Sequence, residues 1–332
     1  MSLIRRIITI TSAVLLVFMI LVLLFNLFMN ISYFEFYSGT KSAGEVAGLN
    51  DGLIQQGIDY VEEEGALLTS GYMNDDSASR IYVTKNGKTT YTRLIDEDGD
   101  EYTGHAGGIT HHGEYLYVGN KGGVDVFPLA DILLGKDTAQ SLGKVSLTNT
   151  ASWVTSHDGY LYAGKFAEVG KDTTSYPADD EHIIENPNNP GEYNCSIVSV
   201  YRLDATKEFG IDNSAPVKIL STTSKVQGGC FTEDGTLILS TSWGLNTSRF
   251  YFYNVDLNGA PDASLDLDGK SVPLYYLGTD KLVKTVRNWS PVMFSCFSRN
   301  SATASSLPRL VVSRSIALLY APSMTVLTSS SI

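Results

Sequence analysis

A phrase that recurs along the chain constrains its fold more than any other feature. Its copies are QQGIDYVEEEGALLTSGY from Gln55, HAGGITHHGEYLYVGN from His105, TASWVTSHDGYLYAGK from Thr150 and VQGGCFTEDGTLILSTSW from Val226. Each copy has a short apolar segment, a turn that carries a glycine, and a second segment with alternating apolar residues. The pattern predicts a β-hairpin, because glycine adopts a positive φ in a tight turn without steric cost. The turn glycines are Gly65, Gly113, Gly159 and Gly235.

The spacing of these hairpins narrows the architecture. Further strand-like segments follow each hairpin, so that a unit of four strands returns about every 40–50 residues, the period of a β-propeller blade. A layered sandwich would show single strands about every 8–12 residues without this longer period. We therefore expect an all-β fold, a β-propeller of five blades over residues 48–285, or of six if the end segments add strands. The only helix expected after residue 40 is a short one at LADILLG.

The N-terminus has the composition of a membrane span. Arg5 and Arg6 precede an uncharged apolar run from Ile7 to Met29, and about 20 such residues cross a bilayer. We expect a cytoplasmic segment at 1–6, an uncleaved transmembrane signal anchor at 7–31 and a linker at 32–47. The aromatic residues of the linker, Tyr33, Phe34, Phe36 and Tyr37, fit an interfacial belt.

This orientation predicts that the propeller lies outside the cell, with the N-terminus in the cytoplasm. The alternative is a cleaved signal peptide and a secreted domain. The net charge of −12 argues against nucleic acid, which requires clustered basic residues. Three cysteines without a CxxC spacing leave room for at most one disulfide, and we expect Cys230 to be a buried free thiol.

Two segments depart from the repeat. Residues 164–195 form an insertion rich in Asp, Glu, Asn and Pro, which predicts a surface loop that covers one face of the propeller. Residues 286–332 contain no acidic residue and lack the glycine turns. This change indicates a C-terminal tail of altered reading frame, or a degenerate closing blade.

His111 and His112 belong to a hairpin turn in the repeat. Neighbouring residues of a strand point to opposite faces, so the two cannot readily hold one ion. We expect both to lie at a solvated hairpin tip.

A ligand site is expected where the first strand of each repeat begins. These starts should surround one mouth of the axial channel, where polar side chains can converge. The predicted ring consists of Gln56, His105, Trp153 and Gln227. The alternative is that these side chains satisfy backbone groups between neighbouring blades.

A weak metal site is expected in the insertion, where Asp179, Asp180, Glu181 and His182 are clustered. Two other acidic segments, DEDGDE at 96–101 and DLDG at 266–269, lack the ligand spacing of a calcium loop and are expected to be polar turns. We expect no cofactor, with calcium as the alternative.

The phrases GLNDGLIQQGIDYVEEEGALLTSGY, HAGGITHHGEYLYV and VQGGCFTEDGTLILSTSWGLNTSRFYFYNV resemble a group of bacterial secreted or membrane-anchored β-propeller proteins without an established activity. A looser similarity runs to the strictosidine-synthase and gluconolactonase superfamily. That likeness implies a divalent metal held by Glu, Asn and Asp in the axial channel. No residue of this chain can be assigned to that ligand set.

The sequence thus predicts a membrane-tethered extracytoplasmic binding module for a protein, peptide or glycan. No catalytic residue is assigned, because the G-x-S-x-G, H-E-x-x-H and phosphate-loop motifs are missing from the sequence. The alternative is a calcium-dependent hydrolase, similar to a lactonase or esterase, that acts from the axial channel.

Overall fold

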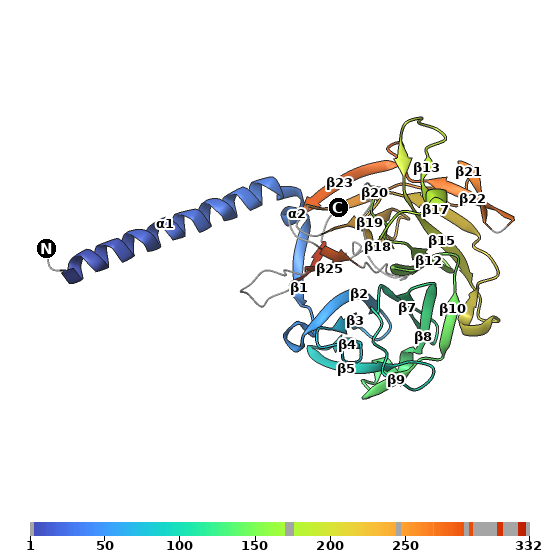
Figure 1. The fold of residues 1–332 in the computed structure, drawn as a ribbon, viewed down its shortest axis with the longest axis horizontal. Helices are drawn as coiled ribbons and strands as arrows, with labels where there is room; N and C mark the ends of the chain where they lie inside the picture. The colour runs from blue at the N-terminus through green and yellow to red at the C-terminus, as the bar shows by residue number, and fades with distance from the viewer. Residues whose placement is uncertain are drawn as a thin grey trace.

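The computed structural model describes residues 3–39, 46–169, 176–243, 247–267 and 269–288, and the backbone of 40–45, 292–294, 311–314 and 325–329. Helix α1 (Leu3–Ser32) projects from a domain made of β-strands (Figure 1). Its apolar stretch has a mean hydropathy of 3.0 and is not buried against the domain. The fold is therefore mostly β, with one N-terminal helix that is long and apolar enough to cross a membrane.

The β-strands form sheets that we number in chain order. The first sheet contains β2 (Leu53–Val61), β3 (Ala66–Met73), β4 (Arg80–Lys85) and β5 (Lys88–Ile95). The second contains β6 (Ile109–His112), β7 (Tyr115–Asn120), β8 (Gly123–Pro128) and β10 (Gly143–Ser146). The third contains β11 (Trp153–His157), β12 (Tyr160–Gly164), β15 (Ser196–Leu203) and β17 (Lys218–Thr222), with β16 (Ile211–Asp212) beside β15.

Two further four-stranded sheets follow in the chain. The fourth contains β18 (Val226–Phe231), β19 (Leu237–Thr241), β20 (Ser248–Tyr253) and β23 (Leu282–Asn288). The fifth contains β24 (Val292–Phe294), β25 (Val311–Arg314), β26 (Thr325–Ser329) and, at its edge, β1 (Thr40–Glu45). The described strands of the tail thus pair with a strand of the segment that was predicted to be a linker. The prediction of a shifted reading frame concerns residues that lie largely outside the described part of the chain.

The predicted hairpins are confirmed. The pairs β2–β3, β6–β7, β11–β12 and β18–β19 are antiparallel neighbours, and all four predicted turn glycines have φ between +58° and +81°. The short helix expected at LADILLG is α3 (Leu129–Leu133). The turn glycines of the repeat therefore located the hairpin strands correctly.

The first strands of the sheets are neighbours in space. Strands β2, β6, β11, β18 and β24 contact one another in that order, and β24 also contacts β2. Glycine permits this close approach: a Cβ atom on Gly108 of the second unit would lie 2.7 Å from the Cα of Trp153 in the third sheet.

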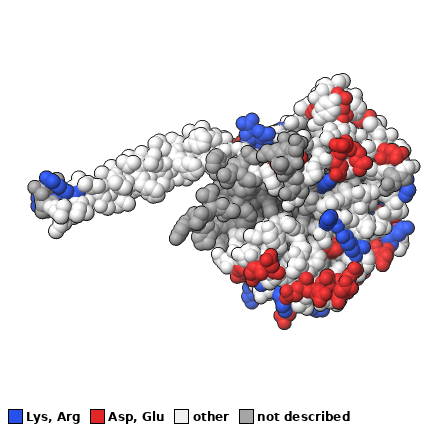
Figure 2. Space-filling model, in the orientation of Figure 1, with Lys and Arg blue, Asp and Glu red and all other residues white. Residues whose placement is uncertain are grey.

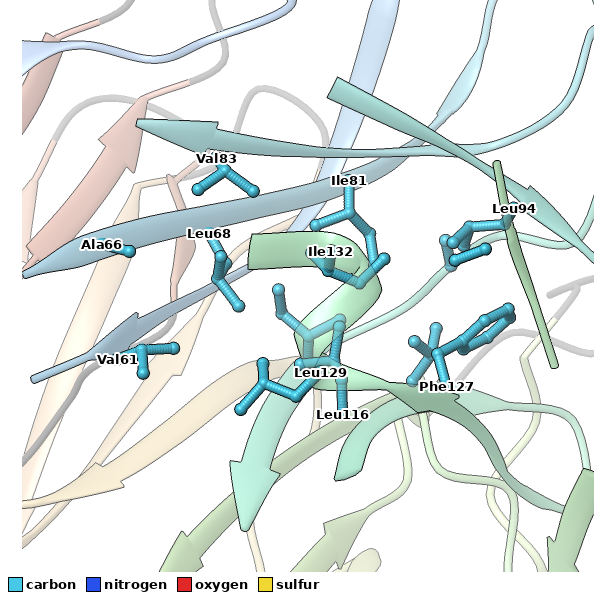
Figure 3. Close-up of a cluster of buried hydrophobic side chains, with 14 of the residues drawn as sticks. Val61, Ala66, Leu68, Ile81, Val83, Leu94, Leu116, Phe127, Leu129 and Ile132 are labelled. Carbon is cyan, nitrogen blue, oxygen red and sulfur yellow. The ribbon is translucent and has the colours of Figure 1, made fainter. Parts of the chain in front are cut away.

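Apolar side chains fill the space between neighbouring sheets. Figure 3 shows the cluster between the first and second sheets, in which Leu68 and Ile81 face Leu116 and Phe127, and Ile132 of α3 closes one side. Similar clusters join the second sheet to the third and the third to the fourth. The second and third sheets are therefore packed on both faces, which explains their apolar strands.

Two short parallel pairings also tie neighbouring units together. Strand β9 (Thr138–Gln140), between β8 and β10 in the chain, pairs with β5 of the first sheet. The hairpin of β21 (Ala263–Leu267) and β22 (Lys270–Tyr276), between β20 and β23, pairs through β22 with β17 of the third sheet.

The aromatic residues after α1 depart from the expected interfacial belt. Phe36 of α2 (Phe34–Gly39) is 2% exposed and packs with the fourth sheet, and Tyr33 is also buried. Only Phe34 is largely exposed, at 68%. The belt prediction was wrong for Phe36 because its ring stacks on Phe250, with centroids 5.9 Å apart.

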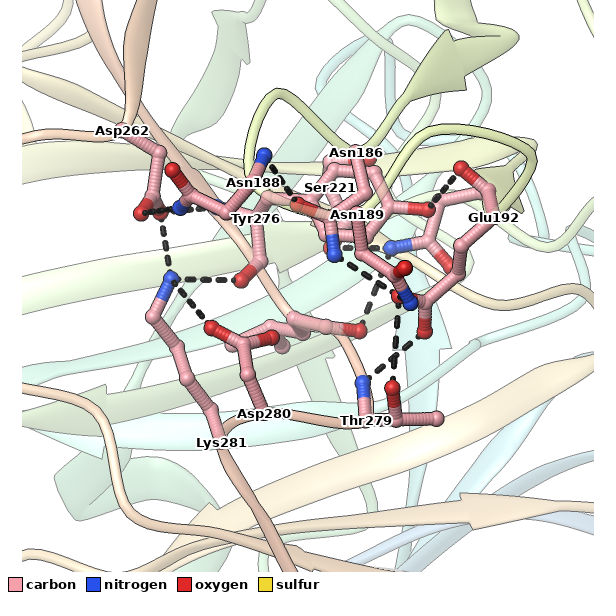
Figure 4. Close-up of polar contacts among 12 residues, drawn as sticks. Asn186, Asn188, Asn189, Glu192, Ser221, Asp262, Tyr276, Thr279, Asp280 and Lys281 are labelled. Atoms are coloured by element: carbon pink, nitrogen blue, oxygen red, sulfur yellow. Dashed lines mark hydrogen bonds and ion pairs between the residues drawn. The ribbon is translucent and has the colours of Figure 1, made fainter.

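Residues 164–169 and 176–195 of the insertion are described, and the second of these parts contains β13 (Ile184–Glu185) and β14 (Tyr193–Asn194). Figure 4 shows how polar contacts fasten this part to the segment around β22. Glu192 accepts hydrogen bonds from Asn186 Nδ2 at 2.7 Å and from the backbone N–H of Thr279 at 2.8 Å. Asn188 donates to Asp262, which forms an ion pair with Lys281. This part of the insertion is docked on the domain.

Two of the cysteines differ in their bonding state. Cys195 is a buried free thiol, whereas Cys230 is disulfide-bonded. The prediction of a free thiol at Cys230 was therefore wrong.

Candidate functional site

A pocket of about 410 Å³ lies where the first strands of the first four sheets end. Its wall includes the turn after β2, the turn after β6, the end of β11 and Phe231 of β18. Because the repeat ends each first strand in a hairpin turn, these turns gather at one end of the ring. The pocket lies in the range of volumes typical of small-molecule sites.

His111 and Asp59 form the polar centre of this pocket. The Nδ1 atom of His111 lies 2.6 Å from Oδ2 of Asp59, and the backbone N–H of His111 donates to the same oxygen at 2.9 Å. An ionised carboxylate only accepts hydrogen bonds, so the ring proton is on Nδ1. The side chain of Asp59 is 8% exposed and that of His111 is 23% exposed.

The environment sets the charge of His111. Burial by itself would lower the pKa of the imidazole, but the Asp59 carboxylate and, more weakly, Glu63 outweigh it, so the pKa of His111 is raised. His112 next to it is more exposed than His111, but part of its ring is still shielded from water, and this shielding and the neighbouring His111 lower the pKa of His112. The prediction of a solvated tip was therefore wrong for His111, because it did not foresee a carboxylate on the neighbouring sheet.

Hydroxyl groups fasten the second sheet to the third below the pocket. Ser156 donates its hydroxyl hydrogen to the carbonyl oxygen of His111 at 3.1 Å. The Thr110 and Ser156 hydroxyl oxygens are 3.0 Å apart, and the N–H of Ser156 donates to Thr110 Oγ1 at 3.1 Å. These bonds fix the backbone that carries His111. The hydroxyl of Ser156 is thus used structurally.

Acidic side chains surround the rim. The turn after β2 brings Glu62, Glu63 and Glu64 to the pocket, and Lys85 pairs with Glu64 at 2.7 Å. A run of three neighbouring carboxylates at the mouth of a pocket attracts cations. The run EEE in the first copy of the repeat was the available signal for this rim.

An aromatic wall closes the other side. Phe231 lines the pocket, and the ring of His157 stacks on it with centroids 4.3 Å apart and planes 6° apart. Burial lowers the pKa of His157, and Asp158 opposes this effect only in part. The wall is therefore flat, mostly apolar and uncharged at neutral pH.

The predicted ring of Gln56, His105, Trp153 and Gln227 belongs to the opposite end of the same strands. Gln56 and Gln227 both lie at β-bulges, and Gln227 donates to the carbonyl oxygen of Ser242 at 3.1 Å. The exposed ring of His105 contacts Tyr72, with centroids 4.7 Å apart.

Trp153 does not face this mouth. Its side chain is 2% exposed and lies in the core between the third and fourth sheets. A Cβ atom on Gly164 would approach its ring to 2.1 Å and one on Gly229 to 2.7 Å, so both glycines make room for the indole. That the four residues Gln56, His105, Trp153 and Gln227 bind a ligand stays a prediction.

In the acidic cluster of the insertion, the side chain of Asp179 forms ion pairs with nearby basic residues. Asp179 pairs with Lys165 and lies 3.1 Å from Nδ1 of His182. Glu181 and Asp180 are exposed, and Glu181 is 4.0 Å from His182 Nε2. Within the described ranges, no group of three or more His, Cys, Asp or Glu residues is placed to hold a metal ion. Metal binding at Asp179, Asp180, Glu181 and His182 stays a prediction.

No family model and no curated protein matches the sequence. Among solved structures, the chain is similar to the PQQ-bound aldose sugar dehydrogenase of Streptomyces coelicolor, with 12% identity, a TM-score of 0.41 and coverage of 87% of this chain and 97% of the other. It is similar to an exo-β-1,3-galactanase of Phanerochaete chrysosporium, with 12% identity, a TM-score of 0.40 and coverage of 66% and 51%. It is also similar to the hydrazine synthase of Kuenenia stuttgartiensis, with 11% identity, a TM-score of 0.33 and coverage of 79% and 63%. Function must therefore be argued from the residues of this chain.

Proposed function

We propose that the chain is a five-bladed β-propeller that α1 holds at the outer surface of a membrane, and that its pocket binds a cationic group. The five sheets, the cyclic contacts of their first strands and the buried faces between them support the propeller. Arg5 and Arg6 before the apolar run support a cytoplasmic N-terminus.

The main support for a cationic ligand is that the acidic rim of the pocket lies beside its aromatic wall. The exposed Glu63 offers negative charge, and Phe231 offers an apolar surface on which an aliphatic stem can pack. A lysine or arginine side chain has this combination of a long apolar stem and a cationic head. We therefore favour a basic peptide or protein segment over a glycan as the ligand.

Binding can be measured with the full chain in detergent. We expect a tri-lysine peptide to bind, and Glu63→Gln to weaken it about fivefold, because an exposed carboxylate contributes up to about 1 kcal/mol. Glu208→Gln removes an exposed acidic residue from the turn after β15, which does not line the pocket, and should leave binding unchanged. Binding of tri-glutamate with equal affinity, or equal weakening by both variants, would contradict the proposal.

The Asp59–His111 pair supports a second candidate, a hydrolase that acts from the same pocket. A carboxylate that orients an imidazole can make it a general base for the attack of water on a lactone or ester. His111→Gln should then abolish turnover on a panel of lactones and esters. The calcium-dependent form of this candidate also predicts that calcium raises the thermal midpoint and that EDTA lowers it. Lack of turnover by the wild-type chain on that panel would remove the hydrolase.

A further inference from the structure

The helix α1 is joined to the domain without a flexible tether. Only Tyr33 separates α1 from α2, and it bonds to both: its N–H donates to Met29 and its carbonyl accepts from Tyr37. Phe36 of α2 then lies in the core against Phe250. The end of α1 therefore has a fixed position relative to the fourth sheet.

The length of the apolar run places this junction at the bilayer surface. Residues 7–29 are uncharged and, at about 1.5 Å per residue, cover the roughly 30 Å hydrocarbon layer. Helix α2 follows at once, and it contacts β23 of the fourth sheet. Strand β23 thus lies next to the headgroup layer if α1 spans the membrane.

Two arginines lie in register at this edge. Arg249 of β20 and Arg287 of β23 are directly opposite each other, and both are exposed. In the described part of the chain, neither forms an ion pair with an acidic residue. Like charges directly across a strand pair are unfavourable unless an anion lies between them.

The charged residues near Arg249 and Arg287 also favour the binding of an anion from outside the chain. Figure 2 shows basic side chains at the junction of α1 and the domain. Lys284, on the other face of β23, is held over the ring of Phe252 at 4.7 Å. The acidic residue of α2 is the exposed Glu35. A basic edge on a chain of net charge −12 is therefore placed at the membrane side.

We propose that Arg249 and Arg287 bind the phosphate groups of anionic lipids in the outer leaflet, and so set the orientation of the domain on the membrane. The guanidinium group suits this role, because it binds phosphate through paired N–H donors. The contact rests on the proposed membrane anchor, but not on the ligand of the pocket.

Hydrogen–deuterium exchange of the full chain in lipid nanodiscs tests the contact. We expect β20 and β23 to exchange more slowly in discs that contain phosphatidylglycerol than in phosphatidylcholine discs, by about fivefold for each arginine. The difference should disappear at about 0.5 M salt, where exposed charges are screened. Arg249→Gln with Arg287→Gln should abolish it, and the corresponding lysine substitutions should retain it in large part.

A matched control is available elsewhere on the domain. Lys88 and Lys207 are exposed and belong to the first sheet and to the turn after β15 of the third, whereas α2 packs on the fourth. Lys88→Gln with Lys207→Gln therefore removes the same charge from other parts of the domain. This variant should keep the lipid effect. Equal exchange in both lipids, or a lipid effect that survives the arginine-to-glutamine change, would overturn the contact alone. A chain that fails to enter the discs would overturn the anchor, and the contact with it.

Discussion

One oxygen of Asp59 accepts hydrogen bonds from both the backbone N–H and the ring Nδ1 of His111, and so joins the first sheet to the second. This contact lies in the wall of the pocket. It links the charge of His111 to the packing of the first sheet against the second.

The pair should make stability depend on pH. The pKa of His111 is raised above 6.5 in the folded chain, so its stabilising contribution is complete below about pH 6.5 and is lost as the pH rises through the folded-state value. Asp59→Asn should cost about 1–3 kcal/mol at low pH and less at high pH. Urea unfolding of the wild-type protein and of Asp59→Asn from pH 6 to 9 measures the difference in their free energies of unfolding. His112→Gln is the control, and a cost of Asp59→Asn that does not change with pH would contradict the prediction.

Phe36 should be part of the folded domain. Its ring is 2% exposed and stacks on Phe250, so Phe36→Ala should lower the free energy of unfolding by about 3 kcal/mol, as is usual for a buried aromatic residue. Phe34, which is 68% exposed, provides a matched control in the same helix. Urea unfolding in detergent measures both. Equal effects of the two substitutions would show that α2 is not docked.

The space around Trp153 should not accept an added methyl group. A Cβ atom on Gly164 would lie 2.1 Å from the indole, and we expect Gly164→Ala to cost about 1–3 kcal/mol through overpacking. In Gly39→Ala the new Cβ meets no atom within 4 Å, and stability should hardly change. Trp153→Leu combined with Gly164→Ala should cost less than the sum of the single changes. Additive costs would mean that the two residues do not compete for space.

Glu192 should hold the insertion on the domain. Burial alone would raise its pKa, but hydrogen bonds from Asn186, Thr279 and Asn189 outweigh burial, so the pKa of Glu192 is lowered. Its contribution is therefore present above about pH 4.5 and is lost as the pH falls through the folded-state value. Glu192→Gln should cost about 1 kcal/mol at neutral pH. It should also increase proteolysis of residues 184–194, whereas Glu233→Gln should change neither property.

The strands could be predicted because their signals are local. Gly113 and Gly159 marked tight turns, and the alternation around Tyr117 and Tyr162 marked strands that the structure contains. The approximate period of the repeat then located the four hairpins. These features depend on residues that are close in the sequence, which is why a single chain was enough.

The site could be predicted only in part, because it depends on contacts between units. The Asp59–His111 bond joins residues of different hairpins, and no local pattern indicates which carboxylate a histidine will meet. The indole of Trp153 points into the core because Gly164 and Gly229 leave room for it. The burial of Phe36 under the fourth sheet also depends on the tertiary fold, whereas its sequence context resembles an interfacial belt.

The pairing of β1 with β26 has a consequence for biosynthesis. Glu45 leaves the ribosome long before its partner Thr325, so strand β1 stays unpaired while the sheets between these two residues are synthesised. Contacts between such distant segments form slowly. A nascent chain that is halted before β26 is left with an unpaired strand edge, which makes it a substrate for chaperones or proteases.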